Sequence, residues 1–243
     1  MNKDRLFTNK NYNNDKFEFN KDVALAFNDM INRSIPMFST IHKLILDICF
    51  SHFDTNNLKV LDLGCSTGAF LKYLINHNLS NNQLSYLGID QSKEMLSVLN
   101  STYKNLDNIL IKTKCLSIDS SQTFDASDIV ILNLVLQFIP KKERVKILSN
   151  IYSSLSLGGC CFVVEKVCFE KSNFQDVSKD VYHNFKFSQG YSKEEVINKD
   201  KSLKNVLIPC SIQDNISMLK QAGFSNVFSF FQWINFVGFI AIK

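Results

Sequence analysis

One segment in the first third of the chain constrains the fold more than any other. Residues 60–70 read VLDLGCSTGAF, an apolar run that reaches an aspartate and then breaks at a turn flanked by glycines. Aliphatic and β-branched residues at 59–63 predict a buried strand, and the apolar spacing over 69–76 predicts a helix. A strand that leads through a short glycine turn into a helix opens a βαβ unit, so the sequence predicts a parallel sheet.

The same alternation continues along the chain. Further strands are expected at 84–89, 109–112, 128–132 and 160–165, and further helices at 93–103 and 141–155. Helices at 22–32 and 39–53 precede the first strand, with Ser39 as the expected N-cap of the second. After a polar and aromatic insertion at about 166–212, a helix is expected at 212–221 and strands at 227–234 and 237–242. These last two strands leave no room for a crossover helix, so they must pair antiparallel.

Length and composition fit one globular α/β domain. The 243 residues are 45% hydrophobic and 21% charged, which suffices for a full core. The seven cysteines include no C-x-x-C pair, which argues against zinc or a disulfide framework and favours reduced thiols in the cytoplasm. Residues 1–21 lack the apolar stretch of a signal peptide, and the apolar segment FVGFIAI is far shorter than the about 20 residues that span a bilayer. We therefore expect a cytoplasmic protein without a membrane anchor.

The charge pattern predicts no nucleic-acid surface. The net charge is +4, and its lysines and arginines are scattered. The densest group, Lys141, Lys142 and Arg144, opens an expected helix beside Glu143 and fits a solvated helix face better than a basic patch. No direct binding to nucleic acid is expected.

The glycine turn does not fit a nicotinamide-dependent enzyme. Such folds carry G-x-G-x-x-G and an acid about 20 residues later, whereas Gly64 and Gly68 flank Cys-Ser-Thr and the next acid that ends a strand is Asp90. The turn presents backbone N–H groups at a helix N-terminus, which favours a carboxylate, and Asp90 can accept hydrogen bonds from ribose hydroxyls. A plain strand–helix turn and a helix cap are the alternative interpretations of these residues.

Together with the antiparallel ending, this pattern resembles the class I S-adenosylmethionine (SAM)-dependent methyltransferase fold. That fold is an α/β, Rossmann-like architecture whose seven-stranded sheet is mostly parallel with a C-terminal antiparallel strand pair.

Six further stretches carry a narrower resemblance. DMINRSIP, LGCSTGA, LNLVLQFIP, a glycine pair before a strand that ends in Glu165–Lys166, HNFKFSQGYS and AGFSNVFSFFQWINF resemble the carboxy-S-adenosylmethionine synthases of bacterial tRNA wobble-uridine modification. The similarity runs from about Asp4 to Lys243. It implies an enzyme that moves a carboxyl group from prephenate to the sulfonium methyl of SAM and releases carboxy-SAM, without a metal.

The resemblance also implies a set of SAM-binding residues, although it assigns no catalytic acid or base. Gly64, Cys65 and Ser66 would contact the amino-acid part of SAM, and Asp90 with Gln91 the ribose. Asn133 would lie near the sulfonium. Phe38 stands where the family has a tyrosine, Cys115 where it has an aspartate that faces adenine, and Leu116 would offer a backbone N–H to the ring. Asp119 is a second candidate for the adenine, and a small buried residue is the alternative interpretation of Cys115.

One position departs from the family in charge. The family places an arginine that holds the new carboxylate where this chain has Asp200, which would repel a carboxylate. We therefore expect Lys199 or Lys201 to turn inward and Asp200 outward, with Arg33 as a further cation. Solvated helix charges are the alternative interpretation of the lysines.

The insertion also contains His183, Ser192 and Glu195. His183 is interpreted as a histidine in a packed interface or as a group that orients prephenate, and Ser192 with Glu195 fits a capping box.

Three functions remain open at this point: a carboxy-SAM synthase, an ordinary small-molecule methyltransferase and a non-catalytic SAM-binding protein. The expected organisation is one SAM-binding catalytic domain over 1–243, with an N-terminal helical cover at 1–53 and a cap or dimerisation insertion at about 166–212. The resemblance implies a homodimer.

Overall fold

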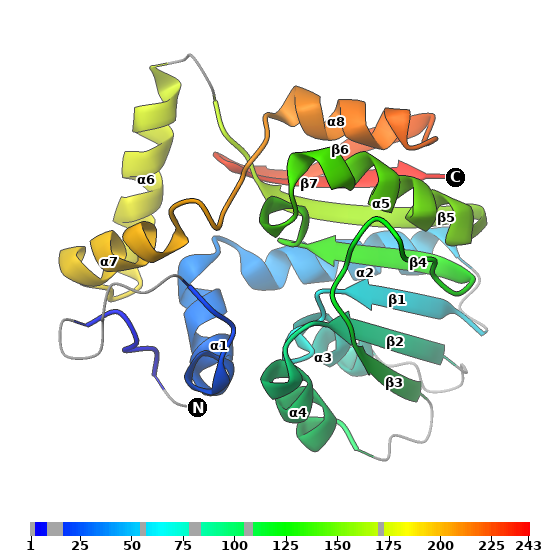
Figure 1. Cartoon of the computed structure of the whole chain (residues 1–243), viewed down its shortest axis with the longest axis horizontal. Coiled ribbons are helices and arrows are strands. Elements are labelled where there is room, and N and C mark those ends of the chain that lie inside the picture. Colours follow the sequence, from blue (N-terminus) through cyan, green and yellow to red (C-terminus); the bar gives the residue numbers. More distant parts are fainter. Residues whose placement is uncertain (1–2, 9–16, 54–56, 78–83, 105–108, 170–172) are drawn as a thin grey trace.

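A seven-stranded sheet forms the centre of the computed structural model, which describes all residues except 1–2, 9–16, 54–56, 78–83, 105–108 and 170–172 (Figure 1). Its spatial order is β3-β2-β1-β4-β5-β7-β6. The strands are β1 (Lys59–Leu63), β2 (Leu84–Asp90), β3 (Ile109–Cys115), β4 (Ser127–Asn133), β5 (Leu155–Lys166), β6 (Asn226–Trp233) and β7 (Phe236–Ile242). The helices are α1 (Lys21–Ser34), α2 (Phe38–His52), α3 (Ala69–Asn76), α4 (Lys93–Thr102), η1 (Leu136–Phe138), α5 (Lys141–Ser154), α6 (Phe174–Ser188), α7 (Lys193–Leu203) and α8 (Ile212–Gln221).

Strand pairing follows the expected mixture of parallel and antiparallel neighbours. β1 pairs in parallel with β2 and β4, β2 with β3, and β4 with β5. β7 pairs antiparallel with both β5 and β6, because only a tight turn joins β6 to β7. The α/β fold class with its C-terminal antiparallel pair is thus confirmed.

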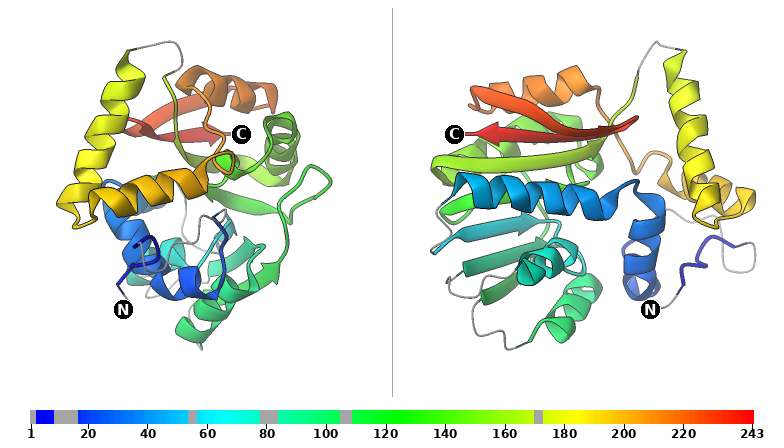
Figure 2. Two further views of the ribbon diagram at one scale, coloured as in Figure 1. Left: turned by 60° about the vertical axis from the view of Figure 1, so that its left-hand side comes forward. Right: turned by 180° about the vertical axis from the view of Figure 1, so that it is seen from behind.

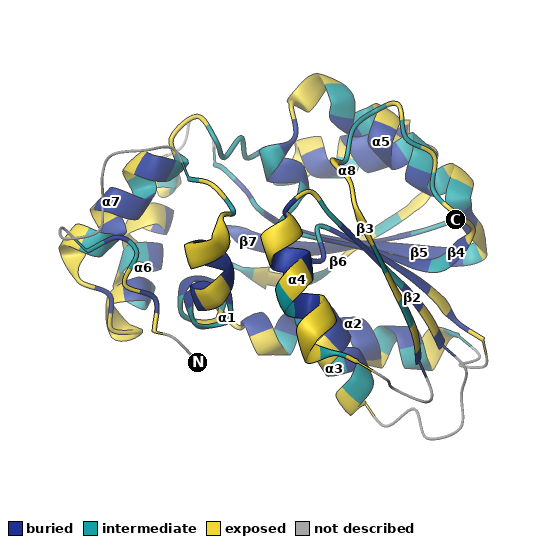
Figure 3. Ribbon diagram, turned by 60° about the horizontal axis from the view of Figure 1, so that its bottom comes forward, coloured by how far each residue is buried: buried dark blue, intermediate teal, exposed yellow. Residues whose placement is uncertain are grey.

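Two apolar cores lie on opposite faces of the sheet. One contains side chains of α2 and α3, including Ile45 and Leu71, and the other contains side chains of α5 and α8, including Ile151. Neighbouring strand residues alternate between them, so Cys160 packs in the first core and Cys161 in the second. The view from behind in Figure 2 shows α2 along its face of the sheet, and Figure 3 shows buried stripes on helices whose outer sides are exposed.

The N-terminal segment and the insertion lie together at one end of the sheet (Figures 1 and 2). Two hydrogen bonds link parts far apart in sequence: Arg33 Nε donates to the Gln189 carbonyl at 2.9 Å, and the Tyr191 hydroxyl donates to Asp4 Oδ2 at 2.5 Å. α1, α6 and α7 therefore form one wall in front of the carboxyl ends of the parallel strands.

Some element boundaries differ from the sequence-based expectation. α2 begins at Phe38 and not after Ser39, and its N-cap Met37 adopts the left-handed conformation (φ 54°) without a side-chain cap. β5 begins at Leu155, because Gly158 and Gly159 pair with the main chain of Lys243 and continue the strand where they were expected only to end a helix. The capping box of Ser192 and Glu195 is confirmed at the start of α7.

Among the described residues, no helix has the length and apolarity that a bilayer crossing requires.

Candidate active site

A cavity of about 460 Å³ lies at the carboxyl ends of β1, β2 and β4, under α1 and the insertion. Its volume falls within the range of about 300–1,000 Å³ that small-molecule sites occupy. Of the residues singled out from the sequence, those that line it are Phe38, Gly64, Cys65, Ser66, Asp90, Gln91, Leu116, Asp119, Asn133, Lys199 and Asp200. Arg33, Cys115 and Lys201 do not line it.

The glycine turn is shaped by close contacts with β2 and with Val135, the second residue after β4. The Ile89 carbonyl accepts hydrogen bonds from the backbone N–H of Gly64 (2.7 Å) and Cys65 (3.1 Å). Gly64 has φ +71°, and a Cβ there would lie 2.5 Å from Val135 Cγ2. A side chain at this position would therefore be strained and would clash at the cavity wall.

Asp90 is held by two backbone donors, one on each carboxylate oxygen. Oδ2 accepts from Ser66 N and Oδ1 from Ser92 N, both at 2.9 Å. Each oxygen keeps lone-pair capacity for one more donor, as two vicinal hydroxyls require. Burial raises the pKa of Asp90, whereas the N–H donors of Ser92 and Ser66 lower it. The cap of α4 is Ser92, whose Oγ accepts from Met95 N, so Asp90 does not serve as the cap.

Three residues were expected to face the adenine: Leu116, Cys115 and Asp119. They differ in exposure and in the hydrogen bonds that they already make. The Leu116 N–H donates to the Asp90 carbonyl at 3.0 Å, so this donor is already engaged. Cys115 is exposed, with Sγ 3.5 Å from the Gln91 carbonyl. Asp119 lines the cavity, and the hydrogen bonds from Ser121 lower its pKa.

Asn133, at the end of β4, is positioned by a histidine that the sequence analysis did not single out. His42 is 1% exposed, and its Nδ1 lies 2.8 Å from the Phe38 carbonyl, which can only accept. Nδ1 therefore carries the proton, and Nε2 accepts from Asn133 Nδ2 at 3.2 Å. Burial lowers the pKa of His42 to about 4, which keeps the ring neutral. Phe38 packs edge-on against the His42 ring at 4.4 Å.

The end of the cavity beneath the insertion is lined by three lysines. Lys186 Nζ lies 3.4 Å from Asp200 Oδ1, and Lys199 Nζ donates to Ser34 Oγ at 2.9 Å. Lys166, the last residue of β5, has its ammonium 4.5 Å from the centre of the Tyr182 ring and no carboxylate within ion-pair distance in the described part of the chain. Burial and then the neighbouring Lys186 lower the pKa of Lys166 to about 8.

Asp200 does not turn outward, contrary to the expectation from its charge. It lines the cavity, and its Oδ2 lies 2.7 Å from His183 Nε2. Burial alone would raise the pKa of Asp200, but Lys186 and His183 lower it below its ordinary value. His183 is thus bound within the insertion of its own chain. Lys199 is buried as expected, and Lys201 is exposed.

Arg33 is used to hold the wall of the cavity together. Its guanidinium lies 3.0 Å from Asp29 Oδ2 and 4.0 Å from the centre of the Tyr191 ring.

The sequence carried a usable signal for Lys166. It ends a strand of the parallel sheet, as Asp90 and Asn133 do, so all three side chains belong to the same sheet edge. No comparable signal marked His42, which looks like any polar residue inside a helix.

Comparison with known proteins gives two kinds of similarity. Residues 61–161 match a family model described as a methyltransferase domain. Over nearly the full length the chain is similar to proteins named carboxy-S-adenosyl-L-methionine synthase. It is 34% identical to that of Campylobacter lari, with 94% of this chain and 95% of the relative covered, and 36% identical to that of Actinobacillus pleuropneumoniae, with both chains fully covered.

Solved structures show the same fold at lower identity. A putative O-methyltransferase from Nostoc punctiforme is 18% identical with a TM-score of 0.60, covering 91% of this chain and 59% of that protein. Human N-acetylserotonin methyltransferase in complex with SAM is 15% identical with a TM-score of 0.58, covering 90% and 54%. This chain spans less than two thirds of either protein. The likeness confirms the class I methyltransferase fold.

Proposed function

The chain belongs to the carboxy-S-adenosyl-L-methionine synthase family of transferases, and we propose that it makes carboxy-SAM from SAM and prephenate for tRNA wobble-uridine modification. In this reaction the carboxyl group of prephenate is transferred to the SAM methyl carbon, and phenylpyruvate is released. The methyl proton lost and the ring hydroxyl lost leave together as water. The single observation that carries the proposal is a cavity with the Asp90 acceptor at one end and, at the other, Lys166, which has no ion-pair partner among the described residues.

The residues of the first end fit SAM. The turn over Gly64–Ser66 would hold the amino-acid part, and the free lone pairs of Asp90 would accept the ribose hydroxyls. Gln91 and Leu116 would flank the nucleoside and Phe38 would cover it, while Asn133 would lie beside the sulfonium. The protein would bind and orient SAM and exclude water from it. The methyl carbon of SAM would then point toward the lysines.

At the second end we assign the carboxylate to Lys166. Lys186 is paired with Asp200 and Lys199 donates to Ser34, whereas the ammonium of Lys166 makes no hydrogen bond or ion pair within the described residues and contacts only the Tyr182 ring, so all of its donors are available to a ligand in the cavity. With Asp200 in place of the family's arginine, this end would offer one ammonium where relatives offer a bidentate guanidinium. Lys199 and Asp200 would contribute by setting the charge around Lys166.

The test compares a lysine that lines the cavity with an exposed one. Lys166→Met should weaken the binding of carboxy-SAM by roughly tenfold or more and change the binding of SAM little, because only carboxy-SAM carries the extra carboxylate. A charge-assisted hydrogen bond contributes about 1.5–3 kcal/mol. Lys201→Met is the matched control and should leave both affinities unchanged, since Lys201 is exposed. Calorimetry with the two ligands measures both. Equal losses for both ligands in Lys166→Met would remove Lys166 from the carboxylate site.

Asp200 is the observation that favours a second candidate, an ordinary small-molecule methyltransferase. The mass of the ligand that copurifies with the protein separates the two, because carboxy-SAM supports the synthase and S-adenosylhomocysteine supports the methyltransferase. Turnover with prephenate gives the second measure. An Asp200→Arg variant that gains carboxy-SAM formation over a weak wild type would show a synthase impaired at this position, and an empty site would favour a non-catalytic protein.

The assembly proposed with this function is a homodimer in the cytoplasm. It would have one catalytic domain covered by residues 1–53 and capped by residues 166–212, would use no metal and would bind neither nucleic acid nor membranes. Its support is a set of exposed apolar side chains on the two helices of the insertion, namely Phe174, Val177, Val181, Phe187 and Ile197. Val177 and Val181 share a face of α6, and Phe187 of α6 and Ile197 of α7 line one hollow. Exposed large apolar side chains that lie near one another are typical of a protein–protein interface.

A further inference from the structure

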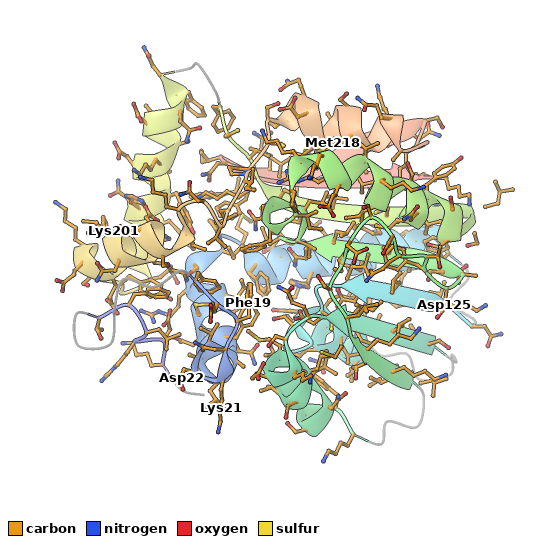
Figure 4. All side chains as sticks on the ribbon, viewed as in Figure 1. Phe19, Lys21, Asp22, Asp125, Lys201 and Met218 are labelled. Carbon is orange, nitrogen blue, oxygen red and sulfur yellow. The ribbon has the colours of Figure 1, made fainter. Side chains whose placement is uncertain are left out.

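A short strap, residues 17–19, crosses the mouth of the cavity from one wall to the other. At one end Phe17 N donates to the Ser202 carbonyl of α7 at 3.1 Å, and at the other Ser92 Oγ donates to the Phe19 carbonyl at 2.8 Å. Phe17 and Phe19 both line the cavity. Figure 4 shows Phe19 between α1 and the sheet, whereas Lys21 and Asp22 lie at the outer end of α1. The strap thus joins the insertion to the edge of the sheet that carries Asp90.

Phe19 forms part of an aromatic wall at this end of the cavity. Its ring packs edge-on against Phe138 of η1, with centroids 5.5 Å apart, and against Phe17 at 5.0 Å. η1 is fixed in turn, because Glu165 accepts hydrogen bonds from the backbone N–H of Val135, Leu136 and Gln137. Phe138 therefore offers Phe19 a rigid partner.

The anchor of the strap lies next to the ribose acceptor. Ser92 Oγ has two acceptors for its one proton, the Phe19 carbonyl of the strap at 2.8 Å and Glu94 Oε2 at 3.1 Å, and we assign the proton to the nearer. Ser92 also donates its backbone N–H to Asp90 Oδ1 and accepts from Met95 N as the cap of α4. A group bound by Asp90 is therefore close to the anchored end of the strap. We propose that Phe19 is a cofactor-contacting residue that closes the nucleoside half of the site, held in place by the Ser92 hydroxyl. The proposal rests on the proposed function only in placing a nucleoside at Asp90.

The chemistry of the strap suits a purine nucleoside. Aromatic rings pack against a purine through their faces and edges, and this contact does not depend on charge. A Phe side chain also has few torsions, so little conformational entropy is lost when the ring is held in place. Removing the ring would expose the nucleoside to water and shorten its residence time, because packing against the ring opposes dissociation.

The first test uses S-adenosylhomocysteine as the probe, because its binding does not depend on carboxyl transfer. Phe19→Ala should weaken it about tenfold or more, mainly through faster dissociation in stopped flow, whereas Phe19→Tyr should stay near the wild type. Phe228→Ala, which truncates an exposed phenyl ring of β6, is the matched control and should have no effect. An unchanged dissociation rate in Phe19→Ala, or a defect confined to the KM for prephenate, would overturn the proposal.

A second variant tests the anchor. Ser92→Gly keeps most of the capping energy, since glycine at an N-cap costs only a few tenths of a kcal/mol, but it removes the hydroxyl donor. It should speed dissociation of S-adenosylhomocysteine in the same direction as Phe19→Ala, and the double variant should be no worse than Phe19→Ala alone. Fully additive losses would mean that the hydroxyl does not act through Phe19.

A fluorescence reporter separates a closed strap from a merely packed one. Trp233 is the single tryptophan of the chain, so Phe19→Trp in a Trp233→Phe background places the one indole on the strap. Acrylamide should quench it less once S-adenosylhomocysteine is bound. Quenching that is unchanged by saturating ligand would overturn the covering role. If wild type binds S-adenosylhomocysteine but makes no carboxy-SAM, the proposed reaction fails while this inference stands.

Discussion

His42 shows how one buried side chain fixes the orientation of another. Its protonated Nδ1 is bound to a carbonyl, so Nε2 must be an acceptor and the Asn133 amide must turn its nitrogen toward it. A charged His42 would present two donors, and its Nε2–H would face the N–H groups of that amide. The neutral ring is therefore part of the geometry at the end of β4.

This predicts a pH dependence of stability. The pKa of His42 is about 4 in the folded protein and 6.5 for a solvated histidine, so the unfolded chain binds a proton between these values that the folded chain does not. The free energy of unfolding should thus fall as pH drops from about 6.5 to about 4, by up to about 3 kcal/mol, and this contribution should be fully present above pH 6.5. Urea unfolding of wild type and His42→Gln measures it. In the glutamine variant, the free energy of unfolding should depend less on pH between about 6.5 and about 4. An equal pH dependence in both proteins would contradict a neutral His42.

At the scale of elements, the wall in front of the cavity depends on a few polar contacts between distant segments. Tyr191 follows α6, Asp4 lies near the start of the chain, and both are buried. Their 2.5 Å hydrogen bond fastens the insertion to the N-terminal segment. Burial and then the Asp4 carboxylate raise the pKa of the Tyr191 hydroxyl, which keeps it a donor.

Removing that hydroxyl should loosen the wall. Tyr191→Phe leaves Asp4 Oδ2 without this donor, and a buried group deprived of its partner costs about 1–3 kcal/mol. Urea unfolding should show a lower midpoint, with weaker S-adenosylhomocysteine binding as a second readout. Tyr152→Phe is the control, because the Tyr152 ring packs on Phe224 and no described contact uses its hydroxyl; it should stay within about 0.5 kcal/mol of wild type. If Tyr152→Phe were destabilised as much as Tyr191→Phe, the loss of stability would not come from the hydrogen bond between Tyr191 and Asp4.

The alternation of strands and helices was predictable from local apolar periods, and so was the sheet edge that carries Gly64, Asp90 and Asn133. α6 and α7 were not predicted as a pair of helices, because their buried sides are completed by segments distant in sequence. Tyr182 of α6 packs on Phe236 of β7, and Asn198 of α7 donates to the Phe7 carbonyl. The orientation of Asp200 was not predictable either. It depends on His183 and Lys186, which lie on the preceding helix and meet Asp200 only after the insertion has folded back.

At the scale of the whole molecule, the insertion has one side against the cavity and another exposed to solvent. Val177 and Val181 lie four residues apart on α6, so they share a face, and they are 50% and 37% exposed. Figure 3 shows exposed residues along the outer side of α6. This face is where the proposed dimer would bury apolar area.

Charge on that face should separate the subunits. Val177→Asp with Val181→Asp is expected to convert a dimer into a monomer, because two carboxylates would lose their water in the interface. Sedimentation velocity measures the mass. Leu157→Asp, at a residue 94% exposed in β5, is the control and should remain dimeric. A monomeric wild type would refute the dimer, and a double variant that stays dimeric would place the interface elsewhere.

The exposure of Cys115 has a practical consequence. Of the seven cysteines, five are buried, Cys168 is intermediate and Cys115 alone is exposed, directly before Leu116 at the cavity. A maleimide or iodoacetamide reagent used under native conditions would therefore alkylate Cys115 first. The chain thus carries a native attachment point for a fluorophore or crosslinker beside the mouth of its site, and it can be labelled there without first removing its other thiols.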